Sequence, residues 1–345
     1  MKQVPGFEKY DKNGRLMVCK LQNSLYGLKQ ASRAWNIKLS RVLQSFGFKM
    51  SRADNSLFYR QQGNSHIIIL TYVDDIIITG PSNSDLKVID DLHKVFALKD
   101  LGDLHYFLGI EVSYTSDGML LSQEKCICEL LEKAGQPMMD GQLYRRIVGG
   151  LQYATITRPG IAFSVNKVSQ YMQNPLDTHW KAIKRILRYL VDTIDQGVLF
   201  SAKSPLTLKA FSDVDWGSDI DDRKSTTGYC VFLGDNLISW SSKKQPTVSR
   251  SSTEAEYRSI AAIVCDVSWI HNLLDELSRT KHLELDLHFV RDKVMSKNIY
   301  VQHVPGTDQI ADILTKPLSG QFFLRLKNKL SIASKAALEL RGPVR

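Results

Sequence analysis

The segment IIILTYVDDIIITG (residues 67–80) constrains the fold of this chain more than any other. Two apolar runs rich in β-branched residues flank Asp74 and Asp75, so the pattern predicts two buried strands in a hairpin with both aspartates at its bend. A tight bend favours Asn-Gly or Asp-Gly, and a carboxylate beside an apolar sheet is tolerated when it is paired or holds a metal. The segment predicts a cation site, with a solvated acidic turn as the simpler alternative.

The charge of the chain points to an anionic partner. Its 345 residues suffice for about two domains, and its formal net charge is +9, which favours contact with phosphate. The basic residues are spread over 20–49, 145–188 and 316–329, as suits a folded groove better than a tail. Five cysteines show neither the density of a secreted scaffold nor paired zinc spacing. No signal region or membrane-spanning run is visible, so we expect an intracellular protein, cytoplasmic with access to the nucleus.

The spacing of apolar residues predicts both helices and strands in each half of the chain. Helices are expected at residues 30–46, 84–96, 122–134, within 143–190, at 253–277 and at 308–314. Strands beyond the hairpin are expected at 104–112, 206–216, 228–233, 237–242 and 299–304. Residues 281–294 fit either type of element, and a domain boundary is expected at 197–205.

Four carboxylates in the second half could serve a metal site. Asp213 and Asp215 lie two apart on a predicted strand and therefore share one of its faces. Glu256 falls on the apolar stripe of the following helix, which makes it the inward-facing acid, and Asp312 has apolar neighbours near the end of the domain. Each acid alone is typical of a solvated surface. Together, Asp213, Glu256 and Asp312 match the carboxylate cluster of a two-metal nuclease.

Seven motifs in a fixed order carry a resemblance to a known family. They are LQNSLYGLKQASRAW (21–35), YVDD (72–75), LGDLHYFLGIEV (101–112), FSDVDW (211–216), STTGY (225–229), SSTEAEY (251–257) and ADILTKPL (311–318). In this order they resemble the reverse transcriptase and ribonuclease H portion of copia-type LTR retrotransposon polyproteins. The resemblance covers nearly the whole chain and implies a retrotransposon-derived RNA-directed DNA polymerase.

The resemblance implies an α+β fold in four parts. Residues 1–135 would form a partial reverse transcriptase palm and thumb, and residues 136–203 a helical connection. Residues 204–335 would form an incomplete ribonuclease H-like mixed α/β domain, followed by a tail at 336–345. The implied partners are an RNA template, a DNA primer, an RNA/DNA hybrid and deoxynucleotides.

The resemblance also implies roles for individual residues. Asp74 and Asp75 would be polymerase carboxylates, while Asp213, Glu256 and Asp312 would be nuclease carboxylates. Each intact site of the family would hold two Mg²⁺ or Mn²⁺ ions. Residues expected to meet nucleotide, template or primer are Gly27, Lys29, Gln30, Arg33, Tyr72 and Gly109. For the basic members of this set, a solvated helix face is the alternative.

Two departures from the family pattern predict very weak or no catalysis. The pattern has a further Asp on a strand upstream of Leu21, and between Leu277 and Lys281 it has a strand with a Tyr-x-Asp-Asn motif and a helix; this sequence shows neither. Each site would lack one carboxylate, which weakens metal binding. In one alternative, residues 283–289 form a replacement strand that carries Asp286. In others, the chain binds nucleic acid without turnover, or is a decayed sequence with no stable product.

Overall fold

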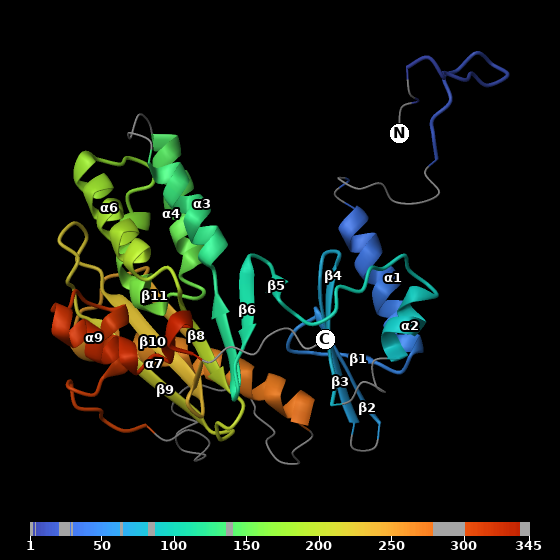
Figure 1. Cartoon of the computed structure of the whole chain (residues 1–345). Helices are drawn as coiled ribbons and strands as arrows, with labels where there is room; N and C mark the ends of the chain where they lie inside the picture. The colour runs from blue at the N-terminus through green and yellow to red at the C-terminus, as the bar shows by residue number, and fades with distance from the viewer. Residues whose placement is uncertain are drawn as a thin grey trace. The chain divides into compact units, whose positions relative to one another are not determined.

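The computed structural model of the chain describes residues 3, 5–20, 28, 30–62, 65–81, 87–135, 141–278 and 301–338. The chain divides into two compact units. The first comprises Met1–Asp100 with Asn272–Lys281, and the second comprises Leu101–His271 with His282–Arg345. Helices and antiparallel sheets occur in both (Figure 1), in agreement with the expected mixed class. The boundary between the units follows Asp100, whereas the sequence analysis set one after residue 135.

The first unit contains a four-stranded antiparallel sheet and two helices. The sheet order is β1 (Lys49–Met50), β2 (Leu57–Gln62), β3 (Ser65–Tyr72) and β4 (Asp75–Thr79), and the helices are α1 (Ala31–Ser45) and α2 (Lys87–His93). The helix predicted at 30–46 is confirmed, and α2 falls within the helix predicted at 84–96.

Alternating side chains of the central strands bury one face of this sheet against both helices. Ile67 and Ile69 of β3 are buried, as strand periodicity requires. They pack in one core with Leu39 and Leu43 of α1 and Leu92 of α2. The core thereby fixes the hairpin that carries the acidic turn.

The second unit contains a five-stranded antiparallel sheet that draws on distant parts of the chain. Its order is β12 (Ile332–Ser334), β8 (Gln196–Ser201), β7 (Gly118–Ser122), β6 (Ile110–Tyr114) and β5 (Tyr106–Phe107). Strand β8 pairs with β7 on one side and with β12 on the other. The boundary expected at 197–205 therefore begins inside a strand of this sheet.

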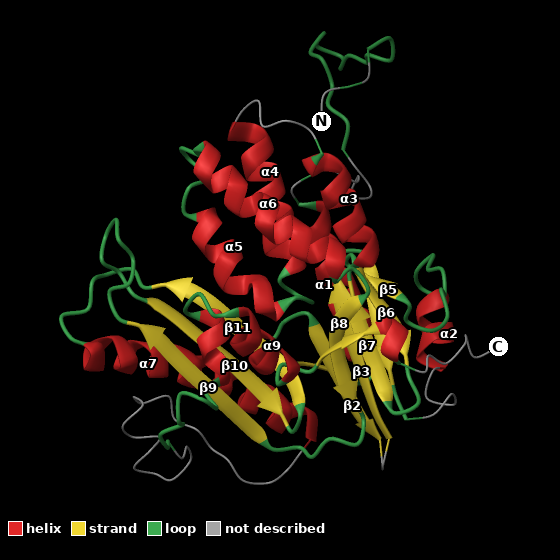
Figure 2. Ribbon diagram, turned by 60° about the vertical axis from the view of Figure 1, so that its left-hand side comes forward, coloured by secondary structure: helices red, strands yellow, loops and turns green. Residues whose placement is uncertain are grey.

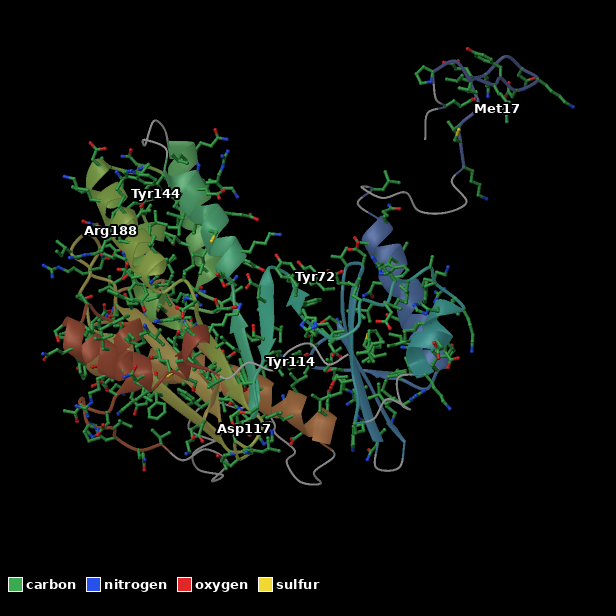
Figure 3. The ribbon with its side chains drawn as sticks, viewed as in Figure 1. Met17, Tyr72, Tyr114, Asp117, Tyr144 and Arg188 are labelled. Atoms are coloured by element: carbon green, nitrogen blue, oxygen red, sulfur yellow. The ribbon has the colours of Figure 1, made fainter. Side chains whose placement is uncertain are left out.

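Four helices of the second unit pack on one another around a shared apolar core. They are α3 (Glu124–Ala134), α4 (Gly141–Ala154), α5 (Ala162–Ser169), which follows the short helix η2 (Pro159–Ile161), and α6 (Asp177–Asp192). Figure 2 shows α3 to α6 gathered together. Tyr144 of α4 lies within this group (Figure 3), fully buried, and its hydroxyl donates to the carbonyl of Val168 at 2.8 Å. The helical region predicted within 143–190 is confirmed.

A three-stranded sheet completes the second unit. Its order is β11 (Asn236–Lys244), β10 (Thr226–Leu233) and β9 (Leu208–Asp215). The helices that follow in the chain are α7 (Ser252–Ser278), which belongs to this unit as far as His271, then η3 (Ile310–Leu314), α9 (Gly320–Asn328) and η4 (Lys335–Ala337). The three predicted strands and the long helix are confirmed. The hairpin expected at Gly234-Asp235-Asn236 is present, but Leu233 of β10 pairs with Asn236 of β11, so its turn consists of Gly234 and Asp235 alone.

A buried carboxylate links α5 to this three-stranded sheet. Asp219, in the loop between β9 and β10, lies 2.6 Å from the Lys167 ammonium of α5 and 2.9 Å from the Lys244 ammonium of β11. Burial alone would raise the pKa of Asp219, but the two ammonium groups hold it well below its usual range. The helices and this sheet are thus joined by charge as well as by apolar packing.

Three local predictions are wrong. The strand predicted at 104–112 is a hairpin, because Leu108 and Gly109 both adopt positive φ and separate β5 from β6. Residues 301–304, the described part of the strand predicted at 299–304, form no strand. The helix predicted at 308–314 is a 3₁₀ helix over Ile310–Leu314. Residues 281–294 and the alternative strand with Asp286 lie outside the described residues.

Candidate functional site

The acidic turn of the first unit is a two-residue hairpin turn. Tyr72 of β3 pairs with Asp75 of β4, which leaves Val73 and Asp74 as the turn residues. Only Asp74 is at the bend, because Asp75 is the first residue of β4. Both carboxylates are exposed, and so are Tyr72 and Val73. The predicted hairpin is confirmed, but the prediction that both aspartates lie at its bend is wrong for Asp75.

Val73 carries the strain of this turn. Its φ is +53°, a region that β-branched residues rarely adopt. Such strain is maintained only where the surrounding structure holds it, and it is common at functional sites. Here the paired strands β3 and β4 hold the turn on both sides, so that Asp74 projects from an exposed bend with a fixed backbone.

Replacing Val73 by asparagine is expected to stabilise the first unit. A left-handed backbone costs an ordinary residue about 1 kcal/mol or more, and asparagine tolerates it. Val73 is 53% exposed, so little packing is lost. Urea unfolding should show a gain of about 1 kcal/mol. Val191→Asn, at a 54% exposed position of helix α6, is the matched control and should show no gain. Equal responses of the two variants would contradict the assignment of strain to Val73.

The residues expected to meet nucleotide or template fall in different parts of the structure. Gln30 immediately precedes α1 and Arg33 lies on its first turn, and both are exposed. Tyr72, at the end of β3, belongs to the same unit. Gly27 and Lys29 lie outside the described residues. Gly109 belongs to the second unit, in the turn between β5 and β6.

The second acidic site brings Asp213 of β9 close to Asp312 of η3. The Lys316 ammonium lies 3.3 Å from Asp213 Oδ2 and 3.0 Å from Asp312 Oδ1. The Thr315 hydroxyl also donates to Asp213 Oδ2. Two of the three predicted nuclease carboxylates therefore meet, as expected, but they meet through a lysine that the sequence analysis did not single out. The ADILTKPL motif contained the signal, because Lys316 follows Asp312 by four residues.

Gly228 allows η3 to approach the sheet at this site. It lies on β10 opposite Asp213 of β9. A Cβ atom at this position would lie 2.6 Å from Thr315 Cγ2 and 3.0 Å from the backbone carbonyl carbon of Leu314. Real Cβ atoms do not come this close to a neighbour, so only glycine fits. Gly228 of the STTGY motif therefore allows η3 to bring Asp312 close to the sheet.

Burial and neighbouring charges oppose each other at this site. Burial raises the pKa of Asp312 and the negative charge of Asp213 adds to this effect, whereas the Lys316 ammonium acts in the opposite direction. Burial alone would lower the pKa of Lys316, but its two carboxylate partners outweigh burial and raise it. The lysine is thus held in its charged form.

Glu256 and Asp215 do not complete a cluster with Asp213 and Asp312. Glu256 is exposed, while Ala255 and Ser259 are the buried residues of this part of α7, so the prediction that Glu256 faces inward is wrong. Asp215 accepts hydrogen bonds from the Thr226 amide and the Ser218 hydroxyl. Within the described ranges, no three His, Cys, Asp or Glu side chains are placed to hold a metal ion.

Neither acidic site fits two divalent ions. Carboxylate oxygens suit Mg²⁺ or Mn²⁺ chemically, but the acidic turn offers Asp74 and Asp75 without a third carboxylate among the described residues. At the second site, an ammonium group lies between the two carboxylates. A two-metal mechanism requires ligands that hold both ions near the reacting phosphate, and these side chains do not supply them.

Helix α6 carries a row of cations on one side. In the sequence they were noted only as part of the basic stretch 145–188. The side chains are Lys181, Lys184, Arg185 and Arg188, all exposed, and none of them forms an ion pair with a described carboxylate. Figure 3 shows Arg188 on the outer side of the helices. A groove of about 390 Å³ between α3 and α6 has an apolar floor and a rim formed by Lys181, Lys184 and Arg188.

Comparison with known proteins agrees with the motifs. The family described as reverse transcriptase (RNA-dependent DNA polymerase) matches residues 1–142. The Pol polyprotein from transposon RE2 of Arabidopsis thaliana is 43% identical over 382 residues, which cover 96% of this chain and 26% of the polyprotein. The Pol polyprotein from transposon TNT 1-94 of Nicotiana tabacum is 34% identical over 375 residues, with coverages of 92% and 28%. A transposon Ty5-1 protein of Saccharomyces cerevisiae is 30% identical over 293 residues, with coverages of 77% and 94%.

These matches define the class of the protein. The chain belongs to the reverse transcriptase family, whose members use divalent metal ions and bind a nucleic-acid template and primer. Within this family it matches the Pol polyproteins of copia-type retrotransposons, as the motifs predicted. The chain spans about a quarter of the length of the two plant polyproteins. No described helix is both long and apolar enough to cross a membrane.

Proposed function

We propose that this chain is a retrotransposon-derived RNA-directed DNA polymerase fragment with a ribonuclease H-like domain, in which both phosphodiester chemistries are impaired. Its substrates would be an RNA template, a DNA primer, an RNA/DNA hybrid and deoxynucleotides. Asp74 and Asp75 would be the polymerase carboxylates, and Asp213 and Asp312 the remaining carboxylates of the nuclease. The observation that carries the proposal is the small number of carboxylates at each site: Asp74 and Asp75 are adjacent on the exposed turn, Asp213 and Asp312 share Lys316, and no third acid joins either pair among the described residues.

The proposed domains follow the family pattern. Residues 1–135 would be a partial palm and thumb, 136–203 a helical connection, and 204–335 the ribonuclease H-like domain, with a tail at 336–345. Support for the last domain comes from three antiparallel strands, β9 to β11, followed by the long helix α7, with acids on β9 and η3.

Internal shortening of the chain supports the impairment. The stretch matched to the RE2 polyprotein, 382 residues, is longer than the 345 residues of this chain, so the match leaves gaps in this chain. The motif comparison sets one gap between Leu277 and Lys281, where the family pattern has a further acidic strand. Loss of a carboxylate weakens a metal site strongly, because fewer oxygen ligands and less negative charge remain to hold the ions.

Primer extension tests the proposal directly. The purified chain should extend a DNA primer on an RNA template very weakly or not at all, with Mg²⁺ or with Mn²⁺. Asp74→Ala is the control, because it removes the acid at the bend of an exposed turn without disturbing the core. Robust synthesis that disappears in Asp74→Ala would overturn the proposed impairment.

A second candidate function is nucleic-acid binding without turnover, and the cations of α6 favour it. Over the seven residues from Lys181 to Arg188 a helix rises about 10 Å, which brings the four charges within reach of neighbouring phosphates of one strand. Because no described carboxylate neutralises them, they would bind phosphate without first breaking an ion pair. Binding of this kind releases counterions and needs no divalent metal.

The salt dependence of binding distinguishes a specific role of the four α6 cations from a general effect of the net charge of the chain. Anisotropy titrations of an RNA/DNA hybrid in EDTA should give a steep fall of log K with log salt. Replacing Lys181, Lys184, Arg185 and Arg188 by glutamine should reduce this slope by about 3 to 4, since each phosphate contact contributes about 0.9. The matched control replaces four ion-paired lysines, namely Lys94, Lys203, Lys329 and Lys335. Equal slopes in the two variants would contradict a specific role for α6.

A further inference from the structure

Lys316 lies at the point where the strand acid and the helix acid converge. Its ammonium is within 3.3 Å of Asp213 and 3.0 Å of Asp312, whose side chains are only 19% and 9% exposed. Two neighbouring features position Lys316. Helix η3 ends at Leu314, and the hydroxyl of Thr315, the residue before Lys316, donates to Asp213. One cation therefore lies between two carboxylates and offsets part of their mutual repulsion.

A divalent ion at this point would have to displace the lysine. Mg²⁺ and Mn²⁺ need several oxygen ligands at about 2 Å, and the oxygens that face the shared space already serve the ammonium and the Thr315 hydroxyl. The other acid of β9, Asp215, is engaged with Thr226 and Ser218. The residues of this site fit a bound ammonium better than a metal.

We propose that Lys316 is an internal counter-ion that takes the place of a divalent cation between Asp213 and Asp312, so that β9 and η3 are held together without metal. The inference concerns the nuclease-like site of the proposed function. The experiment that tests it uses no nucleic acid, so this inference and the proposed function can fail separately. Failure of the chain to bind an RNA/DNA hybrid would not affect the inference about Lys316. Metal binding between Asp213 and Asp312 would not affect the proposed polymerase function.

Thermal unfolding in EDTA and in a MnCl₂ titration tests the proposal on the full chain. The melting temperature of the wild type should be the same in both. Lys316→Met should melt about 4 °C lower in EDTA, because two buried carboxylates lose their counter-ion, and Mn²⁺ should restore most of that loss. Calorimetric titration should show Mn²⁺ binding at least about tenfold tighter in Lys316→Met than in the wild type.

Lys329→Met is the matched control. Lys329 also lies 3.0 Å from a carboxylate, but Asp308 is its only acidic partner among the described residues, and both side chains are more exposed than Asp213 and Asp312. This variant should lose little stability and gain no response to Mn²⁺. A response to Mn²⁺ in Lys316→Met no larger than in Lys329→Met would overturn the proposal.

Mn²⁺ titrations of the wild type and of Asp312→Asn test the proposal even if Lys316→Met does not fold. Both retain Asp74 and Asp75, so any Mn²⁺ binding at the acidic turn contributes equally to the two titrations. Equal calorimetric responses support the proposal, since Asp312 then binds no metal in the wild type. A smaller response in Asp312→Asn would mean that metal does bind between Asp213 and Asp312, and the proposal would be wrong.

Discussion

Replacing Arg158 by methionine is expected to lower the free energy of unfolding of the second unit by about 3 kcal/mol. Arg158 is 2% exposed and is the largest of the fully buried side chains described. Its guanidinium donates to the carbonyls of Thr193 at 3.2 Å and Ile194 at 3.0 Å, just after the end of helix α6. These acceptors carry the negative end of the helix dipole, which favours a cation.

The cost arises because methionine fills a similar volume but donates no hydrogen bond: the Ile194 carbonyl loses the Arg158 donor, while the Thr193 carbonyl keeps only the Gln196 amide. An unsatisfied buried polar group costs about 1–3 kcal/mol. Burial already lowers the pKa of Arg158 to about 10, which shows how much solvation the charge gives up. Removing that charge offsets part of the loss, so we expect about 3 kcal/mol and not the full sum of its hydrogen bonds.

Urea unfolding followed by circular dichroism measures this effect. Arg146→Met, on the exposed face of α4, is the control and should change stability by less than about 0.5 kcal/mol. Arg158→Lys should remain clearly destabilised, because a single ammonium cannot reproduce the fork that reaches both carbonyls. Wild-type stability in Arg158→Met would mean that the end of α6 does not depend on this side chain.

Replacing Gly228 by alanine is expected to cost about 2–3 kcal/mol. The added methyl group would press on Leu314 and Thr315, and at 3.0 Å one of the opposing atoms belongs to the backbone. The 3₁₀ helix η3 must therefore move away from the sheet. Movement of η3 would also separate Thr315 and Lys316 from Asp213.

Gly149→Ala is the matched control for this substitution. Gly149 lies in helix α4, where an added Cβ meets nothing within 4 Å. Alanine is favoured over glycine within a helix, so this variant should gain up to about 1 kcal/mol. The two substitutions add the same methyl group and should change the urea midpoint in opposite directions. A Gly228→Ala protein as stable as the wild type would show that η3 does not pack closely on β10.

Local sequence patterns predicted helices and strands correctly where the spacing of apolar residues and the turn residues indicate the same structure. The strands β9 to β11 and helix α7 were predicted because apolar spacing and the Gly234-Asp235 turn agree. The apolar pattern at 104–112 did not show the turn at Leu108, because a bulky residue gives no sign of positive φ; only the resemblance to the family pointed to a turn at Phe107-Leu108-Gly109. The pairing of β8 with β7 and β12 was missed because long-range pairing leaves no local signal in any of the three segments.

The orientation of α7 shows why part of the candidate site could not be predicted. We assigned Glu256 to the inward face because it shares a stripe with large apolar residues. The helix instead turns small residues toward the sheet: Ser259 is buried, shares a hydrogen bond with the Ser212 hydroxyl at 2.6 Å and donates to the carbonyl of Asp213 at 3.1 Å. Hydrophobic periodicity gives such residues little weight, so it selected the wrong side of the helix.

The position of β12 has a consequence for how the protein is made. Ile332 pairs with Val198 of β8, and Val198 packs in one core with residues of β10, η3 and α9. During synthesis, β8 therefore leaves the ribosome long before the strand that completes its sheet. Until β12 emerges, β8 presents an open edge that can pair with other chains. A topology with such distant contacts folds slowly, so the nascent second unit depends on chaperones, or on rapid completion of the chain, to avoid aggregation.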